Sequence, residues 1–131
     1  MRVVIFCSTD ISKGTGSAIR ARLIIEGLRY HGANLCIVSG SINEDLDKSI
    51  IQYNFELKKS WYEILDSAVK SFSPDILFGI TEAGTDIVYK IAKKNKIPFV
   101  FDLHGIGIIE IIELGGGYGS RIQRSINSLK W

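Results

Sequence analysis

The sequence predicts an α/β fold, a single domain built on a doubly wound (Rossmann-like) parallel sheet with helices on both faces. Two observations predict this class. Short apolar runs recur along the chain without polar alternation, which is typical of strands covered on both faces. Amphipathic segments separate these runs, so strand and helix alternate in βαβ order. The 131 residues suffice for one hydrophobic core.

The first part of the chain predicts two strands joined by a helix, followed by an edge strand. Residues 3–7 form a continuous apolar run, and residues 34–38 ("NLCIV") form another. Between them, "SAIRARLIIEGLRYHG" places apolar residues at helical spacing, and Gly32 suits the left-handed end of a helix. After an acidic loop, residues 50–55 predict a short strand at the edge of the sheet.

The second part of the chain continues the alternation. Ser60 and Glu63 have the spacing of a capping box, which predicts a helix that begins there and ends before Pro74. The elements expected after it are a strand, a helix, a strand and a last helix, at residues 75–80, 84–96, 98–103 and 120–131. The alternation therefore extends through the whole chain.

Composition and charge exclude several classes of protein. The net charge is +2 and the charges of both signs are interspersed, so no basic stripe predicts a nucleic-acid partner. Cys7 and Cys36 lie in strand-like apolar runs, which predicts buried free thiols rather than a disulfide or a metal site. The N-terminus lacks the apolar core of a signal peptide, and no apolar segment is long enough to span a membrane. We therefore expect a cytoplasmic protein.

The predicted fold also predicts where a site should lie. Open parallel sheets bind ligands outside the carboxyl ends of their strands, where the strand order reverses. Residues 8–16, 81–84 and 104–107 should line this crevice. In the first of these loops, glycines before a helix allow backbone N–H groups to approach a phosphate. The residues expected there are Lys13, Gly14, Thr15, Gly16, Ser17 and Arg20.

Each of these residues has a plainer interpretation. The glycines of "GTG" could simply allow a turn, because the third glycine of the dinucleotide fingerprint is lacking. Lys13 and Arg20 could be solvated surface charges. Glu82 could accept a hydrogen bond from a sugar hydroxyl, or could be a first-turn acid favoured by the helix dipole. His104, at the exit of the strand "FVFDLHG", could be catalytic or could serve as a loop or capping residue.

Three separated pieces of the sequence agree with one family. A first strand followed by "KGTGSAIRARLIIEGLRYHGANLCIVSG", then "PDILFGITEAGTDIVYKIAKKNKIPFVFDLHG", resembles the N-terminal domain of the retaining family 4 glycosyltransferases of the GT-B fold. The similarity spans most of the chain. The Gly-rich loop with its long helix ending in "HG", and the strand ending in His-Gly, carry most of it.

The resemblance implies an acceptor-side domain of an enzyme that transfers a sugar from a nucleotide-sugar donor to a sugar or lipid-linked acceptor. It implies that a C-terminal domain, absent from these residues, holds most of the donor, so that the chain alone should be inactive. It places catalysis at His104, with Gly14, Gly16 and Gly105 in the interdomain cleft. It implies neither a metal nor a cofactor beyond the nucleotide sugar. Asp102 is expected to support His104 or the local backbone.

Two other classes compete with this interpretation. A flavodoxin-like or receiver-like binding module would have the same fold, but a receiver needs an acidic pair after the first strand, and only Asp10 lies there. A dinucleotide-dependent oxidoreductase should end its second strand on an acid that binds a ribose. The second strand here ends in Ser39, Gly40 and Ser41 instead.

The segment "IGIIEIIEL" (106–114) is unusually apolar for a crevice mouth. Its two acids, Glu110 and Glu113, would share one helical face. We expect either a flap that contacts a lipid-linked acceptor or a membrane surface, or a segment that packs against the missing domain or the core.

Overall fold

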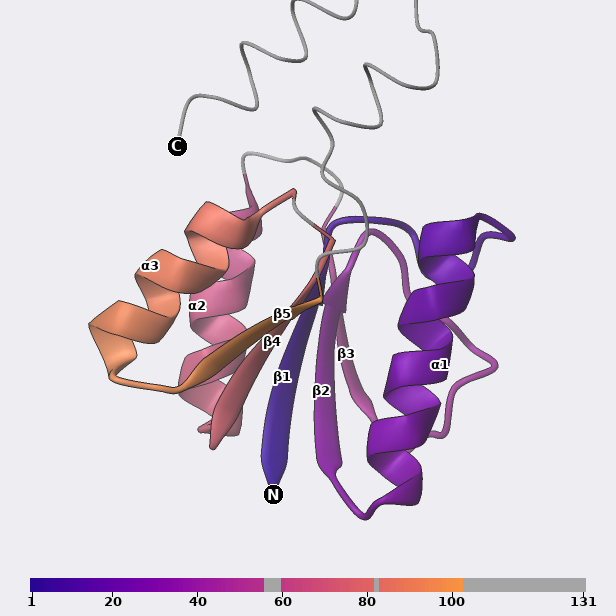
Figure 1. Ribbon diagram of the computed structural model, residues 1–131, viewed down its shortest axis with the longest axis horizontal. Helices are drawn as coiled ribbons and strands as arrows, with labels where there is room; N and C mark the ends of the chain where they lie inside the picture. Colours follow the sequence, from indigo (N-terminus) through magenta and orange to yellow (C-terminus); the bar gives the residue numbers. More distant parts are fainter. Residues whose placement is uncertain (56–59, 82, 103–131) are drawn as a thin grey trace, which may run out of the picture.

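The computed structural model describes residues 1–55, 60–81 and 83–102, which form one α/β domain with a Rossmann-like fold (Figure 1). Within these ranges, five parallel strands make a single sheet. The elements in chain order are β1 (Arg2–Cys7), α1 (Gly16–Tyr30), β2 (Asn34–Ser39), β3 (Ile51–Asn54), α2 (Trp61–Phe72), β4 (Ile76–Ile80), α3 (Thr85–Asn95) and β5 (Phe99–Asp102). The predicted fold class is confirmed.

The strand order is β3-β2-β1-β4-β5, so β1 lies at the centre of the sheet. The chain proceeds outward from β1 to β3, then crosses back through α2 to place β4 on the other side of β1. In register, Phe6 of β1 lies between Val38 of β2 and Gly79 of β4. The order therefore reverses between β1 and β4, which is where a parallel sheet of this kind binds its ligands.

Helices cover both faces of the sheet, as Figure 1 shows. Successive side chains of β1 point to opposite faces of the sheet. Val3 and Ile5 pack with α1, whereas Val4 and Phe6 pack with α2 and α3. All four are buried. This explains why the strand has no polar alternation, because a strand covered on both faces has no solvent side.

Among the described residues, the predicted element boundaries agree with the observed ones to within one or two residues. Thr15 is the N-cap of α1, and its hydroxyl accepts a hydrogen bond of 3.4 Å from the N–H of Ala18. The capping box predicted at Ser60 is wrong, because the Ser60 side chain makes no capping hydrogen bond. Its backbone is helical (φ −91°, ψ 0°), whereas a side-chain cap needs an extended residue.

The predictions about the two cysteines and about membrane-spanning segments can be compared with the described residues. Cys7 and Cys36 are buried and free, as expected. Burial raises the pKa of the Cys36 thiol to about 12, so this side chain behaves as a small apolar residue. Within the described ranges, every helix is too short or too polar to cross a bilayer. The last helix predicted at 120–131 lies outside the described residues.

Candidate functional site

Four residues form a continuous series of contacts along the carboxyl edge of the sheet. The hydroxyl of Ser8, directly after β1, lies 2.6 Å from the hydroxyl of Thr81, directly after β4. The Thr81 N–H donates to the carbonyl of Asp102, at the end of β5, over 3.2 Å. The carboxylate of Asp102 binds Arg20 of α1. We call Ser8, Thr81, Asp102 and Arg20 the strand-end network.

The link between Arg20 and Asp102 is a two-point ion pair. Arg20 donates from Nε to Oδ2 and from Nη2 to Oδ1, both over 2.6 Å. The Asp102 side chain is 13% exposed and that of Arg20 is 50% exposed. Hydrogen bonding by Asp102 raises the pKa of Arg20. The prediction that Arg20 supplies charge to the crevice therefore needs refinement, because its charge is neutralised by Asp102.

A second group of contacts orders the loop between β1 and α1. The Asp10 carboxylate accepts hydrogen bonds from the backbone N–H of Ser12 (3.0 Å), from the Ser12 hydroxyl (2.5 Å) and from the hydroxyl of Ser41 after β2. Hydrogen bonding by Ser12 and Ser41 lowers the pKa of Asp10 to about 2. Lys13 lies 3.7 Å from the same carboxylate. The loop is therefore tied both to itself and to the end of β2.

The same loop contacts Gly40, the residue that follows β2. The N–H of Gly40 donates to the carbonyl of Thr9 over 3.3 Å. A Cβ at Gly40 would lie 3.3 Å from the backbone N of Asp10, so a glycine is favoured here by the close approach of the loop. The loop and the residue that follows β2 are therefore in direct backbone contact. In dinucleotide-binding domains an acid at the end of the second strand binds the ribose, whereas Ser39, Gly40 and Ser41 lie there in this chain.

The loop that leads into α1 is held by the side chain of Arg22, on the same helix. Arg22 donates from Nη1 to the carbonyl of Ile11 over 2.6 Å and to that of Lys13 over 2.9 Å. A Cβ at Gly14 or Gly16 would meet nothing within 4 Å. Neither glycine is therefore required by packing against the described residues, and the loop presents open backbone beside the positive end of the α1 dipole.

The structure describes six of the nine predicted site residues. Lys13, Gly14, Thr15, Gly16, Ser17 and Arg20 all lie between the β1 loop and the first turns of α1. Thr15 caps the helix, Lys13 faces Asp10 and Arg20 pairs with Asp102. Glu82, His104 and Gly105 lie outside the described residues, as does the apolar segment 106–114. The expected support of His104 by Asp102 therefore stays a prediction.

Sequence reasoning missed the polar residues that connect the strand ends. It places Ser8 and Thr81 in loops at the crevice but does not single them out, and it weighs Asp10 only as a receiver acid. The available signal is a polar residue directly after each apolar run. This signal becomes informative once the strand order shows that the runs are neighbours.

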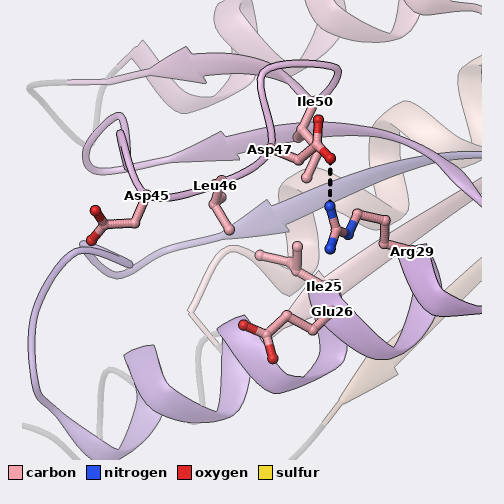
Figure 2. A pocket seen from close by; sticks show the side chains of 7 residues that line it. All are labelled: Ile25, Glu26, Arg29, Asp45, Leu46, Asp47 and Ile50. Atoms are coloured by element: carbon pink, nitrogen blue, oxygen red, sulfur yellow. Dashed lines mark hydrogen bonds and ion pairs between the residues drawn. The ribbon is translucent and has the colours of Figure 1, made fainter.

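A shallow cavity of about 210 Å³ lies away from the strand-end network, between α1 and the connection that leads to β3 (Figure 2). Its lining residues are Ile25, Glu26, Arg29, Asp45, Leu46, Asp47 and Ile50. Arg29 forms an ion pair with Asp47, which leaves the acids of the lining in excess. This cavity is therefore unsuited to a phosphate. No three potential metal ligands gather anywhere in the described part of the chain.

Comparison with known proteins does not assign this chain to a family. No protein-family model matches the sequence, and no curated protein does. Among solved structures, a mutated uronate dehydrogenase is similar with a TM-score of 0.49 and 17% sequence identity. The match covers 76% of this chain and 38% of the dehydrogenase, so the chain spans well under half of that protein.

Proposed function

We propose that this domain is the acceptor-side half of a glycosyltransferase that uses a nucleotide-sugar donor. The donor would be held mainly by a second domain beyond these residues. The sequence resemblance to the family 4 glycosyltransferases suggests this class. Polar side chains lie at the switch point between β1 and β4, as a sugar-binding crevice would need.

The observation that carries the proposal is the path of the loop between β1 and α1. Its backbone contacts Gly40 directly after β2, and the end of β2 carries two serines and a glycine rather than the acid that binds a dinucleotide's ribose. The oxidoreductase alternative is therefore disfavoured. A receiver-like module is disfavoured as well, because three hydrogen-bond donors from Ser12 and Ser41 already occupy Asp10.

The same loop suits the chemistry of sugar transfer. Departure of a nucleoside diphosphate develops negative charge, which preorganised backbone N–H groups can stabilise without rearrangement. Gly14, Thr15, Gly16 and Ser17 provide such groups at the start of α1. In this proposal Lys13, whose exposed side chain lies 3.7 Å from Asp10, would exchange that ion pair for the diphosphate.

The remaining predicted site residues would contact the sugars. His104 would orient or deprotonate the acceptor hydroxyl, with Gly105 allowing close approach of the backbone. Glu82 would accept a hydrogen bond from a sugar hydroxyl. Segment 106–114 would contact the acceptor, and a lipid-linked acceptor would bring it to a membrane surface.

Amide chemical shifts of the isotopically labelled chain test this proposal. UDP-glucose, GDP-mannose, NAD⁺ and FMN are titrated separately. We expect at least one nucleotide sugar to shift the amides of the β1–α1 loop and of Thr81, with weak affinity because the donor half is missing. Tight binding of NAD⁺ or FMN at the same edge, with no response to nucleotide sugars, would contradict it.

A further inference from the structure

Three residues other than glycine have positive φ angles in the described part of the chain: Ser73 (48°), Thr81 (74°) and Lys96 (55°). Ser73 and Lys96 are the C-caps of α2 and α3, where a left-handed residue commonly ends a helix. Thr81 follows a strand and ends no helix. Capping therefore accounts for two of the three angles and leaves Thr81 unexplained.

Thr81 is also the residue of the three for which this backbone is most costly. A branched Cβ crowds the neighbouring carbonyl in the left-handed region, so threonine is a genuine outlier there. Such strain is usually retained where it places a functional group. What this backbone places is the Thr81 hydroxyl, 2.6 Å from that of Ser8 across the point where the strand order reverses.

The two hydroxyls can both donate a hydrogen bond to a ligand and accept one from it. One O–H is used in the bond between them, which leaves the other O–H as a donor and oxygen lone pairs as acceptors. Both residues are only partly buried. The charges linked to the pair through the strand-end network, Arg20 and Asp102, neutralise each other. A neutral group that both donates and accepts fits this environment better than an anion.

We propose that Ser8 and Thr81 form a subsite for a hydroxyl of a neutral sugar, and that the strained backbone of Thr81 is retained for this contact. The inference rests on the proposed function in one respect, that the bound sugar is the acceptor. The sugar hydroxyl would bind at the switch point between β1 and β4, whereas the phosphate groups of the donor would bind at the start of α1.

Amide chemical shifts test the subsite with free sugars as probes: methyl α-glucoside, galactose, mannose and N-acetylglucosamine, with inorganic diphosphate for comparison. At least one sugar should shift the amides of Ser8 and Thr81. Ser8→Ala and Thr81→Gly should each weaken that binding about five- to tenfold, as expected for one lost hydrogen bond. Thr81→Ser, which keeps the hydroxyl, should bind within about twofold of the parent.

The melting temperature separates a binding role from a structural one. Thr81→Gly relieves strain but loses one hydroxyl contact, so Tm should stay the same or rise by up to about 3 °C. Ser73→Gly and Lys96→Gly are matched controls, because they change a positive-φ residue to glycine away from the crevice and should leave sugar binding unchanged. A marked fall in Tm for Thr81→Gly alone would make Thr81 a structural residue.

The remaining outcomes also decide the matter. No shift with any sugar, shifts with diphosphate alone, or equal sugar binding by the parent and Thr81→Gly would each overturn the subsite. Binding that needs both hydroxyls, in a protein that transfers no sugar, would support the subsite and refute the proposed function. Sugar transfer that is unaffected by Thr81→Gly would support the proposed function and refute the subsite.

Discussion

The guanidinium of Arg20 on α1 and the carboxylate of Asp102 at the end of β5 form two hydrogen bonds of 2.6 Å each. The two residues are far apart in the sequence, and their contact joins α1 to the strand at one edge of the described sheet. In the sequence, His104 follows Asp102 by two residues and lies outside the described residues.

The first prediction concerns this pair. Arg20→Ala and Asp102→Asn should each lower Tm by a few degrees, and the double variant should be no less stable than the worse single variant. The effects should be non-additive because each substitution breaks the same two-point contact. Thermal unfolding of the four proteins at low and high salt measures the coupling. Fully additive effects would show that the contact contributes nothing.

A second prediction uses two glycines of the same helix. Gly27 lies in the interior of α1 with nothing near its Cβ position, so Gly27→Ala should stabilise the fold by about 1 kcal/mol. Gly16→Ala, at the helix start, should leave stability unchanged or slightly raised while it weakens nucleotide-sugar binding severalfold. Chemical denaturation and amide titration measure the two effects. Unchanged binding by Gly16→Ala would remove this loop from the site.

The third prediction concerns how the contribution of Asp66 to stability depends on pH. This residue is 8% exposed, and its carboxylate binds Lys70 of α2 at 2.7 Å and Lys94 of α3 at 3.0 Å. Hydrogen bonding by Lys70 and then by Lys94 lowers the pKa of Asp66 below its ordinary value of 3.8. Its contribution to stability is therefore fully present above that value and is lost as pH falls through the lower folded-state pKa.

Asp66→Asn should destabilise the protein by about 1 kcal/mol at pH 7, and the difference from the parent should shrink below about pH 4. Urea denaturation across the range from neutral to strongly acidic pH measures this. Asp86→Asn is the control, since Asp86 forms an exposed pair with Lys90 at 3.6 Å and should have little effect. A difference for Asp66→Asn that stays constant down to the most acidic pH would contradict the lowered pKa of this carboxyl.

Much of the fold can be predicted because its signals are local. The run at residues 3–7 and the helical spacing in α1 each depend on neighbouring residues alone, and both predictions agree with the observed elements to within a residue. The cap predicted at Ser60 fails because the capping-box spacing fixes the residue types but not the backbone angles. A serine with a helical backbone cannot direct its hydroxyl to the helix start.

The site is harder to predict because its contacts depend on strand order and backbone angle. Ser8 and Thr81 meet only because β4 lies beside β1 and not beside β3. The sequence suggests that Arg20 offers its charge to a ligand, but it does not reveal that Asp102 lies beside it. The φ angle of Thr81 cannot be predicted, since threonine ordinarily avoids that region.

A fourth prediction concerns His104 in the natural protein that contains this domain. His104→Ala should lower turnover about 10²-fold or more, as expected for a group that transfers a proton or orients the acceptor. Tm should change little, because His104 is predicted to lie at a loop mouth, where a side chain contributes little to the core. Rate and melting temperature are measured together. A variant that unfolds while its folded fraction keeps normal turnover would make His104 structural.

The most direct test of the proposed function is sugar transfer by the natural protein that contains residues 1–131, with whatever domains accompany them. The protein is incubated with a panel of nucleotide sugars and with mixed sugar and lipid-linked acceptors, and products are identified by mass spectrometry. We predict transfer from at least one donor, release of the nucleoside diphosphate and no transfer by residues 1–131 alone. Robust transfer by the isolated chain, or reduction of NAD⁺ by the natural protein without any sugar transfer, would contradict the proposal.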